Sequence, residues 1–247
     1  MSDVVESLLA DRDLAQWSSV PTEELCDVVY SVIYSDPAGD VRKPATVEES
    51  RYVSAVTDGY AKTKAFGAWI FRVSEQGSAP EDEPMRRFYL DAKPDTAAVL
   101  ADALTETLNA GSFQWTLKLP ATLGGFARSS AVVIYVRTAD YPAAKSAVLE
   151  AVDGKSLLGE ASTPFAKQLR LGVSAADEPP RDSAHLPPTR DKHSFGTARA
   201  DAICEVLQGG RFNEPDALVE AARGALERYN VDPTRPWLGD RSYTDDL

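Results

Sequence analysis

Hydrophobic residues recur along the chain with two periods, and each period predicts a type of element. Apolar positions three or four residues apart predict helices at 94–109, 141–152, 197–207 and 214–229. Alternation of apolar with polar residues predicts strands at 66–73, 86–91 and 113–119. The almost wholly apolar run at 131–137 is typical of a central strand, and the Pro-rich segment 178–191 is expected to be irregular.

The N-terminal third has a helical pattern. Leu8 and Leu9 belong to a short first helix, and Thr22 is suited to cap a second one, with acidic residues in its first turn. One face of this second helix is apolar and consists of Leu25, Val28, Val29, Val32 and Ile33. A loop rich in Pro, Gly and Asp follows at 35–45.

The order of the elements predicts an α+β fold, with a mixed or antiparallel sheet flanked by helices. We expect residues 1–60 to form a helical N-terminal region and residues 61–247 to form the α+β domain. The length of 247 residues suits a single compact unit of this kind.

Composition limits the environment and the partners. A net charge of -12 argues against sequence-independent binding to nucleic acid or to a membrane of anionic lipid. The first residues, MSDVVESLLADRD, lack the pattern of a signal peptide, and no apolar run approaches the roughly 20 residues of a membrane span. Cys26 and Cys204 match no metal spacing and are expected to be buried free thiols, which implies a reducing compartment and a cytoplasmic location.

Cations gather where carboxylates are missing. No acidic residue lies between Glu106 and Asp140, a stretch that contains Lys118, Arg128 and Arg137. A second acid-free stretch, at 161–176, contains Lys167 and Arg170. An anion pocket needs such segments, because a neighbouring carboxylate would neutralise it. The alternative interpretation is that strands and loops simply carry fewer charges.

Individual cations can be assigned to faces of the predicted strands. Arg86 and Arg87 are adjacent on a strand, so only one of them can point toward a shared site. Lys118 alternates with Leu117 and Leu119, and a lysine held among arginines loses its proton more easily and can act as a base. The alternative is a lysine that faces solvent on an edge strand.

Several fragments, in this order, resemble the HopA-type effector family over residues 86–238: RRFYLDAKPD, FQWTLKLP, FARSSAVVIYV, TPFAKQLRLGVSAADEPP, SFGTARADAI and VDPTRPWL. The most specific elements are SFG-x-x-R, from Ser194 to Arg199, and Arg128 before the apolar strand. Founding members of this family are type III secretion effectors of plant pathogens. Related proteins occur in bacterial gene clusters for thioamitides and class V lanthipeptides.

In that biosynthetic branch, the resemblance implies a lyase that works with a separate kinase-like protein. The kinase phosphorylates Ser or Thr in the core of a precursor peptide that also has a leader. The lyase then eliminates phosphate and leaves dehydroalanine or dehydrobutyrine. This chemistry needs no metal and no organic cofactor, and the sequence contains no kinase motif, which fits a separate lyase subunit.

The resemblance also implies roles for single residues. By analogy with lysine-based phosphothreonine lyases, Lys118 is expected to be the general base. The expected phosphate ligands are Arg87, Arg128 and Arg199, because a leaving dianion favours two or three cationic contacts.

Three further residues near these cations have weaker assignments. His193 is expected to protonate the leaving group or to hold the phosphate. Tyr135 is a candidate for orienting the substrate, although an aromatic residue on a central strand is usually part of the core. Ser194 can cap a helix whose N-terminal N–H groups would face the substrate phosphate.

Two alternative hypotheses, in which the protein is not an enzyme, stay open. The chain could act as an effector through contacts with host proteins, or it could be a scaffold that binds the leader peptide for the kinase. In the first case, replacing Lys118 or Arg128 with Ala would leave function intact, whereas surface changes would abolish it.

Overall fold

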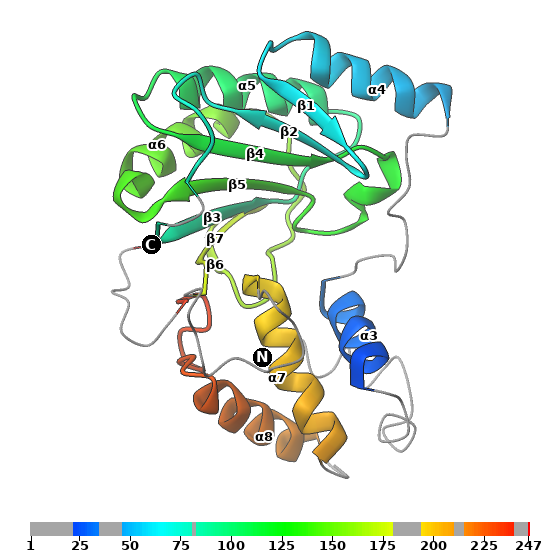
Figure 1. Cartoon of the computed structure of the whole chain (residues 1–247), viewed down its shortest axis with the longest axis vertical. Coiled ribbons are helices and arrows are strands. Elements are labelled where there is room, and N and C mark those ends of the chain that lie inside the picture. Colours follow the sequence, from blue (N-terminus) through cyan, green and yellow to red (C-terminus); the bar gives the residue numbers. More distant parts are fainter. Residues whose placement is uncertain (1–21, 35–45, 81–82, 180–193, 210–214, 240–246) are drawn as a thin grey trace. The chain divides into compact units, whose positions relative to one another are not determined.

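The fold combines a seven-stranded sheet with helices (Figure 1), in a computed structural model that describes residues 22–34, 46–80, 83–179, 194–209, 215–239 and 247. The strands are β1 (Thr63–Phe66), β2 (Trp69–Val73), β3 (Met85–Leu90), β4 (Trp115–Pro120), β5 (Val132–Arg137), β6 (Lys167–Arg170) and β7 (Val173–Asp177). The helices are α3 (Thr22–Tyr34), α4 (Val47–Asp58), α5 (Ala97–Asn109), α6 (Tyr141–Val152), α7 (Phe195–Gly209) and α8 (Pro215–Arg228). The predicted α+β class, with its helical N-terminal region, is confirmed.

The strand order is β1-β2-β4-β5-β3-β7-β6, which places β5 in the middle of the sheet, as its apolar sequence predicts. β5 pairs antiparallel with both β3 and β4. The pairs β1–β2, β2–β4 and β6–β7 are antiparallel too. The sheet is therefore built on antiparallel hydrogen bonding, one of the two arrangements expected from the sequence.

The chain divides into two units that we describe separately. The sheet unit comprises residues 39–163 and 167–175, and the helical unit comprises residues 1–38, 164–166 and 176–247. The helical unit joins residues from both ends of the sequence. The division at residue 60 expected from the sequence stays a prediction.

In the sheet unit, one face of the strands is the core. Ile70, Leu117 and Ile134 alternate inward from three neighbouring strands and are completely buried. The buried residues Leu100 and Leu104 of α5 supply the matching apolar stripe, and Figure 1 shows α5 and α6 together behind the strands. The other face of these strands carries half-buried residues, and the candidate site lies there.

Three sequence-based assignments in this unit need correction. The strand predicted at 66–73 corresponds to β2 and begins too early, because Gly67, with φ of 59°, turns the chain between β1 and β2, and β1 itself was not anticipated. Helix α4 was not anticipated, although Thr46 and Glu49 form a capping box at its start. Strands β6 and β7 were not anticipated either.

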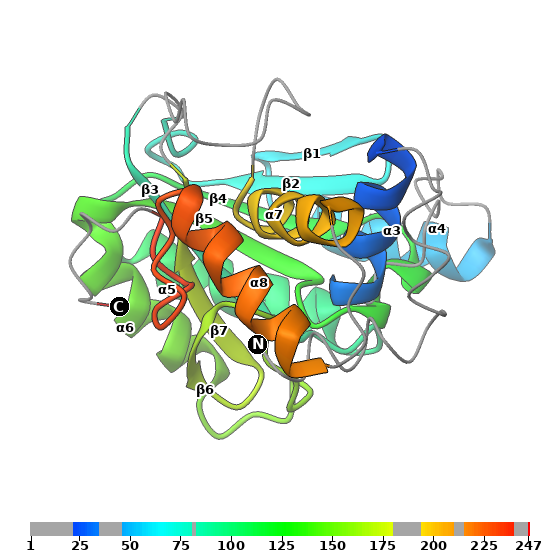
Figure 2. The ribbon, with the colours of Figure 1, turned by 90° about the horizontal axis from the view of Figure 1, so that it is seen from below.

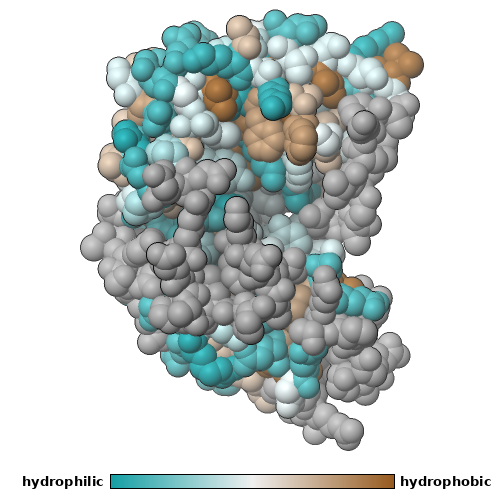
Figure 3. Space-filling view, in the orientation of Figure 1, coloured by the Kyte–Doolittle hydropathy of each residue, from teal (hydrophilic) through white to brown (hydrophobic). Residues whose placement is uncertain are grey.

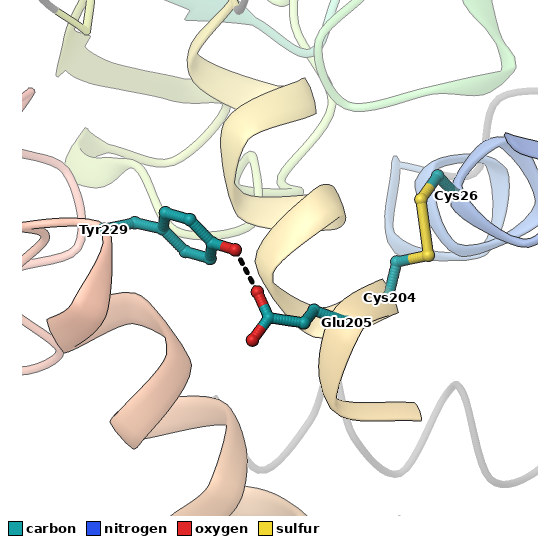
Figure 4. Close-up of a disulfide and its surroundings, with 4 residues drawn as sticks. All are labelled: Cys26, Cys204, Glu205 and Tyr229. Atoms are coloured by element: carbon teal, nitrogen blue, oxygen red, sulfur yellow. Dashed lines mark hydrogen bonds between the residues drawn. A yellow bond between two sulfur atoms is a disulfide. The ribbon is translucent and has the colours of Figure 1, made fainter. Parts of the chain in front are cut away.

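In the helical unit, α7 lies between α3 and α8 and packs against both (Figures 1 and 2). A Cβ on Gly196 would lie 3.1 Å from atoms of Tyr30 and Tyr34, so glycine permits the close approach of α7 to α3. On the α8 side, Glu205 accepts a hydrogen bond from Tyr229 (Figure 4) and another from Arg228. Burial and this hydrogen bond to Glu205 raise the pKa of Tyr229 to about 12.

The expectation of free thiols is wrong. Cys26 of α3 and Cys204 of α7 form a disulfide, with their Cα atoms 5.3 Å apart (Figure 4). Both residues are buried, as predicted. They lie 178 residues apart in sequence, so no local spacing pattern predicts that they form a disulfide. The inference of a reducing compartment depended on free thiols and loses its support.

Two expected segments, the helix at Leu8 and Leu9 and the loop at 35–45, lie outside the residues that the structure describes, as does nearly all of the Pro-rich segment. Among the helices that are described, none combines the length and apolarity needed to cross a membrane.

Candidate functional site

The candidate site is on the four strands β2, β4, β5 and β3, which are neighbours in the sheet. It is the face of these strands opposite the apolar core, and it is called the open face from here on. Because side chains alternate along a strand, residues two apart share a face. Trp69 on β2, Lys118 on β4 and Tyr135 on β5 are half-buried on this face, together with Arg87 on β3. Each of the four strands thus contributes at least one polar or aromatic side chain to a single surface.

Trp69 brings two cations together. The Nζ atom of Lys118 lies 3.7 Å from the centre of the indole ring, and the Cζ atom of Arg128 lies 4.7 Å from it. Arg128 follows the short 3₁₀ helix η1 (Leu123–Ala127), and only 7% of it is exposed. A cation over an aromatic face is attracted to the ring, so Trp69 stabilises both positive charges.

A second pair adjoins the first. The Cζ atom of Arg87 lies 4.7 Å from the ring centre of Tyr135, its direct cross-strand partner. Tyr135 also pairs with Thr116, two residues before Lys118. Tyr135 and Lys118 are therefore diagonal neighbours, with Cα atoms about 7–8 Å apart, a distance that long side chains can span.

Among the residues of these four strands, the charged side chains on this face are all cationic. On these four strands, the residues on the open face include Lys118, Arg87 and Arg137, and none of them is acidic. Arg137 stands apart, at the end of β5, where it forms ion pairs with Asp140 and Glu83. The acid-free segment seen in the sequence thus becomes a cationic surface lined with aromatic rings.

Arg86 and Arg87 separate as strand geometry requires. Arg86 pairs with Val136, is 2% exposed, and places its Cζ atom 4.7 Å from the ring centre of Tyr141 in the core. Arg87 is on the open face. The choice of Arg87 over Arg86 as the side chain directed to a shared site agrees with this arrangement.

In the helical unit, Ser194 caps α7. Its hydroxyl accepts a hydrogen bond from the amide of Thr197 at 3.3 Å, and its carbonyl accepts one from Ala198. The helix begins at Phe195, two residues before the predicted start. This cap confirms the structural interpretation of Ser194, and its role toward a substrate stays a prediction.

Arg199 joins α7 to the segment that follows α8. Its guanidinium donates to the carbonyls of Pro236 at 2.9 Å and Leu238 at 2.6 Å, and its side chain is completely buried. Its Cζ atom also lies 4.1 Å from the ring centre of Phe195. These bonds give Arg199 a structural task, and its role as a phosphate ligand stays a prediction.

The sequence-based set is thus only partly brought together. Lys118, Arg128, Arg87 and Tyr135 share one face of the sheet unit. Ser194 and Arg199 belong to the helical unit, and His193 lies outside the described residues. Trp69 was missed as a site residue: its place in an alternating strand was visible, but its contact with Lys118 depends on β2 pairing with β4.

No group of three or more His, Cys, Asp or Glu residues is placed to hold a metal ion in the part of the chain that the structure describes. The groups on the open face are instead suited to an anion. Guanidinium and ammonium groups bind phosphate or carboxylate, and the aromatic rings offer flat surfaces for the rest of a ligand.

The molecule is therefore an α+β protein with a cationic, aromatic sheet face. The model of the HopA1 effector protein family matches residues 62–238, well over half of the chain, and the chain belongs to this family. The family suggested by the sequence fragments is confirmed. No curated protein matches the sequence.

Two solved structures share the fold. An effector protein from Pseudomonas syringae pv. tomato strain DC3000 superposes with a TM-score of 0.61 at 12% identity, covering 97% of this chain and 100% of its own. An effector protein from Pseudomonas syringae pv. syringae strain 61 gives 0.56 at 16% identity, covering 92% and 96%. At these identities the likeness concerns the fold alone.

Proposed function

We propose that this protein is a lyase that eliminates phosphate from phosphoserine or phosphothreonine in a precursor peptide, leaving dehydroalanine or dehydrobutyrine. The observation that supports it most is the placement of Lys118, Arg128 and Arg87 on one face of the sheet, around the rings of Trp69 and Tyr135. Membership of the HopA1 effector protein family is consistent with this activity.

The reaction breaks a Cα–H bond and a Cβ–O bond and forms a Cα–Cβ double bond. In the proposal, the neutral amine of Lys118 takes the Cα proton, and the electrons of that bond form the double bond. The electrons of the Cβ–O bond leave with the phosphate. Atoms and charge balance without an oxidant, a reductant or a cofactor.

The arginines serve the leaving group. Phosphate departs close to a dianion, and cationic side chains that are already in place stabilise the charge that develops on its oxygens. Arg128 lies on the same ring as Lys118 and is the first ligand, while Arg87 is the second.

Tyr135 orients the substrate backbone, with its ring held by Arg87. His193, Ser194 and Arg199 belong to the same proposal as leaving-group acid, substrate-orienting residue and third phosphate ligand. The partners are a precursor peptide, with its leader and its phosphorylated core, and a separate kinase-like protein that supplies the phosphate ester.

The test incubates the purified chain with a phosphothreonine peptide, with and without the leader and the kinase-like protein. We expect free phosphate and a dehydrobutyrine residue by mass spectrometry. Arg128→Ala should lower kcat/KM by roughly 10²- to 10³-fold. Arg51→Ala, on the exposed surface of α4, is the matched control and should have no effect.

Absence of elimination under every one of these conditions would contradict the proposal. Binding of the leader without any elimination would favour a scaffold. Full function in the Arg128→Ala variant, measured as host-protein or leader binding, would favour a role without chemistry.

A further inference from the structure

The edge of the sheet at β1 is an exposed strand. β1 is the first strand in the sheet order, and three of its four residues are exposed, including Phe66 at 71%. Val73 donates its amide to the carbonyl of Lys62, which fixes the alternation of the β1–β2 hydrogen bonds. By that alternation, the amides of Thr63 and Ala65 point away from β2, toward the open edge.

A groove of about 550 Å³ runs along this hairpin. Its lining is mostly apolar and consists of Lys62, Thr63, Lys64, Phe66, Phe71 and Val73. Figure 3 shows hydrophobic side chains gathered over β1 and β2, with hydrophilic ones beside them. Lys62 donates to the carbonyls of Ser74 and Glu75, whereas the ammonium of Lys64 is exposed and has no partner among the described residues.

The groove and the candidate site lie on the same face of the sheet. Lys64 is the cross-strand partner of Phe71, and Phe71 is the partner of Lys118. These three residues therefore form one row across three strands, from the edge to the proposed base. A ligand held at the edge can reach the candidate site without changing faces.

We propose that the β1 edge and its groove bind an extended segment of the substrate peptide as an added strand. The amides of Thr63 and Ala65 bond to the peptide backbone. An apolar side chain of the peptide enters the groove beside Phe66 and Phe71, and a carboxylate pairs with Lys64. The identification of this peptide as the substrate depends on the proposed lyase function, whereas the binding mode itself does not.

The positive charge of Lys64 favours an acidic peptide over a second copy of the chain at this edge. An antiparallel pair of β1 strands would bring two Lys64 residues close together, and like charges repel. A lysine alone could serve to protect an edge strand from pairing. An exposed phenylalanine beside it has the opposite effect, since it offers apolar surface to a partner.

The geometry sets a spacing between anchor and reaction. Neighbouring strands lie about 4.8 Å apart, so a strand added to β1 runs about 14 Å from β4, the strand of Lys118. An extended chain covers about 3.3 Å per residue. At least four or five residues should therefore separate the anchored segment from the phosphorylated residue.

The test uses a fluorescein-labelled Val–Glu peptide of repeating Val-Thr-Glu-Thr, without phosphate, and measures anisotropy with the full chain. The spacing of two places Val and Glu on the same face of the added strand, as the groove and Lys64 require. Ala65→Pro removes an outward amide and spares the β1–β2 hydrogen bonds, while Ala65→Val keeps that amide and is the matched control. We expect Ala65→Pro, Phe66→Ser and Lys64→Glu each to weaken binding by about tenfold or more. Ala65→Val should bind normally, and a Val–Lys peptide should bind weakly to the unaltered chain.

A second measurement separates this proposal from the lyase function. The same variants should eliminate phosphate normally from a short phosphothreonine peptide that lacks the anchor. Equal binding by Ala65→Pro and Ala65→Val would overturn the added strand, whether or not elimination is observed. So would sedimentation that shows a dimer of the unaltered chain and a monomer for Ala65→Pro, because the edge would then bind a second copy.

Discussion

At the scale of the residue, fragments that identify the family also stabilise the fold. In VDPTRPWL, Asp232 accepts hydrogen bonds from the side chain and the amide of Thr234, and it pairs with Arg235 at 2.9 Å. The turn leads directly to Pro236 and Leu238, whose carbonyls accept from Arg199. The motif thus holds the segment after α8 against α7.

The charge of Asp232 should make the stability of the folded state depend on pH. The hydrogen bond from the Thr234 side chain is the main cause that lowers its pKa from 3.8 to about 2. A carboxylate whose pKa is lowered in the folded state stabilises that state above about pH 4, and this stabilisation is lost as pH falls through about 2. Asp232→Asn should cost about 1 kcal/mol at pH 7, since water screens the pair, and progressively less from pH 4 to pH 2.

Thermal unfolding of Asp232→Asn at several pH values measures this effect. Asp95→Asn, an exposed acid on the sheet unit, is the control and should show little change. A stability difference that stays constant down to pH 2 would contradict the assigned role of the Asp232 charge.

At the scale of the element, the disulfide joins two helices that the sequence places at opposite ends of the chain. Cys26 and Cys204 close a loop of 178 residues between α3 and α7. Crosslinking residues so far apart removes much conformational freedom from the unfolded chain, which is worth on the order of 3–5 kcal/mol.

Reduction should therefore lower the melting temperature by about 10 °C. The double variant Cys26→Ala, Cys204→Ala should melt at the lower temperature with or without reductant, provided that the two helices still pack. Thiol titration of the unreduced, denatured protein gives a direct check. Two reactive thiols per chain would contradict the disulfide.

How well each element could be predicted depends on its sequence pattern. α5, α6 and β5 have strong apolar periodicity and were placed within a few residues. α4 has a narrow buried face, consisting of Glu49, Tyr52 and Val56, and gave no clear stripe. The strand predicted at 66–73 covers β2 and the hairpin turn but misses β1, because the turn is only Gly67 and Ala68, without a polar cluster.

The residues of the candidate site likewise differ in how well local sequence patterns predict them. A segment without acids pointed to Lys118 and Arg128, and strand alternation separated Arg87 from Arg86. Trp69 could not be recognised, because its contact with Lys118 depends on which strands are neighbours. The pairing of the two cysteines is a long-range contact of the same kind, and no local pattern encodes it.

At the scale of the whole molecule, the net charge of -12 and the cationic sheet face belong together. The open-face positions of β2, β4, β5 and β3 carry no carboxylate, although the chain as a whole is acidic. The proposed reaction requires such a separation, because a carboxylate at the site would repel the phosphate.

The role of Lys118 can be measured most directly on a single phosphothreonine peptide. Elimination by the unaltered chain is compared with that by Lys118→Ala and by Lys155→Ala, an exposed lysine that serves as control. We expect Lys118→Ala to lower kcat by roughly 10²- to 10⁴-fold, with partial rescue by added methylamine, and Lys155→Ala to have no effect. Unchanged elimination by a folded Lys118→Ala variant would contradict the assignment of Lys118 as the base.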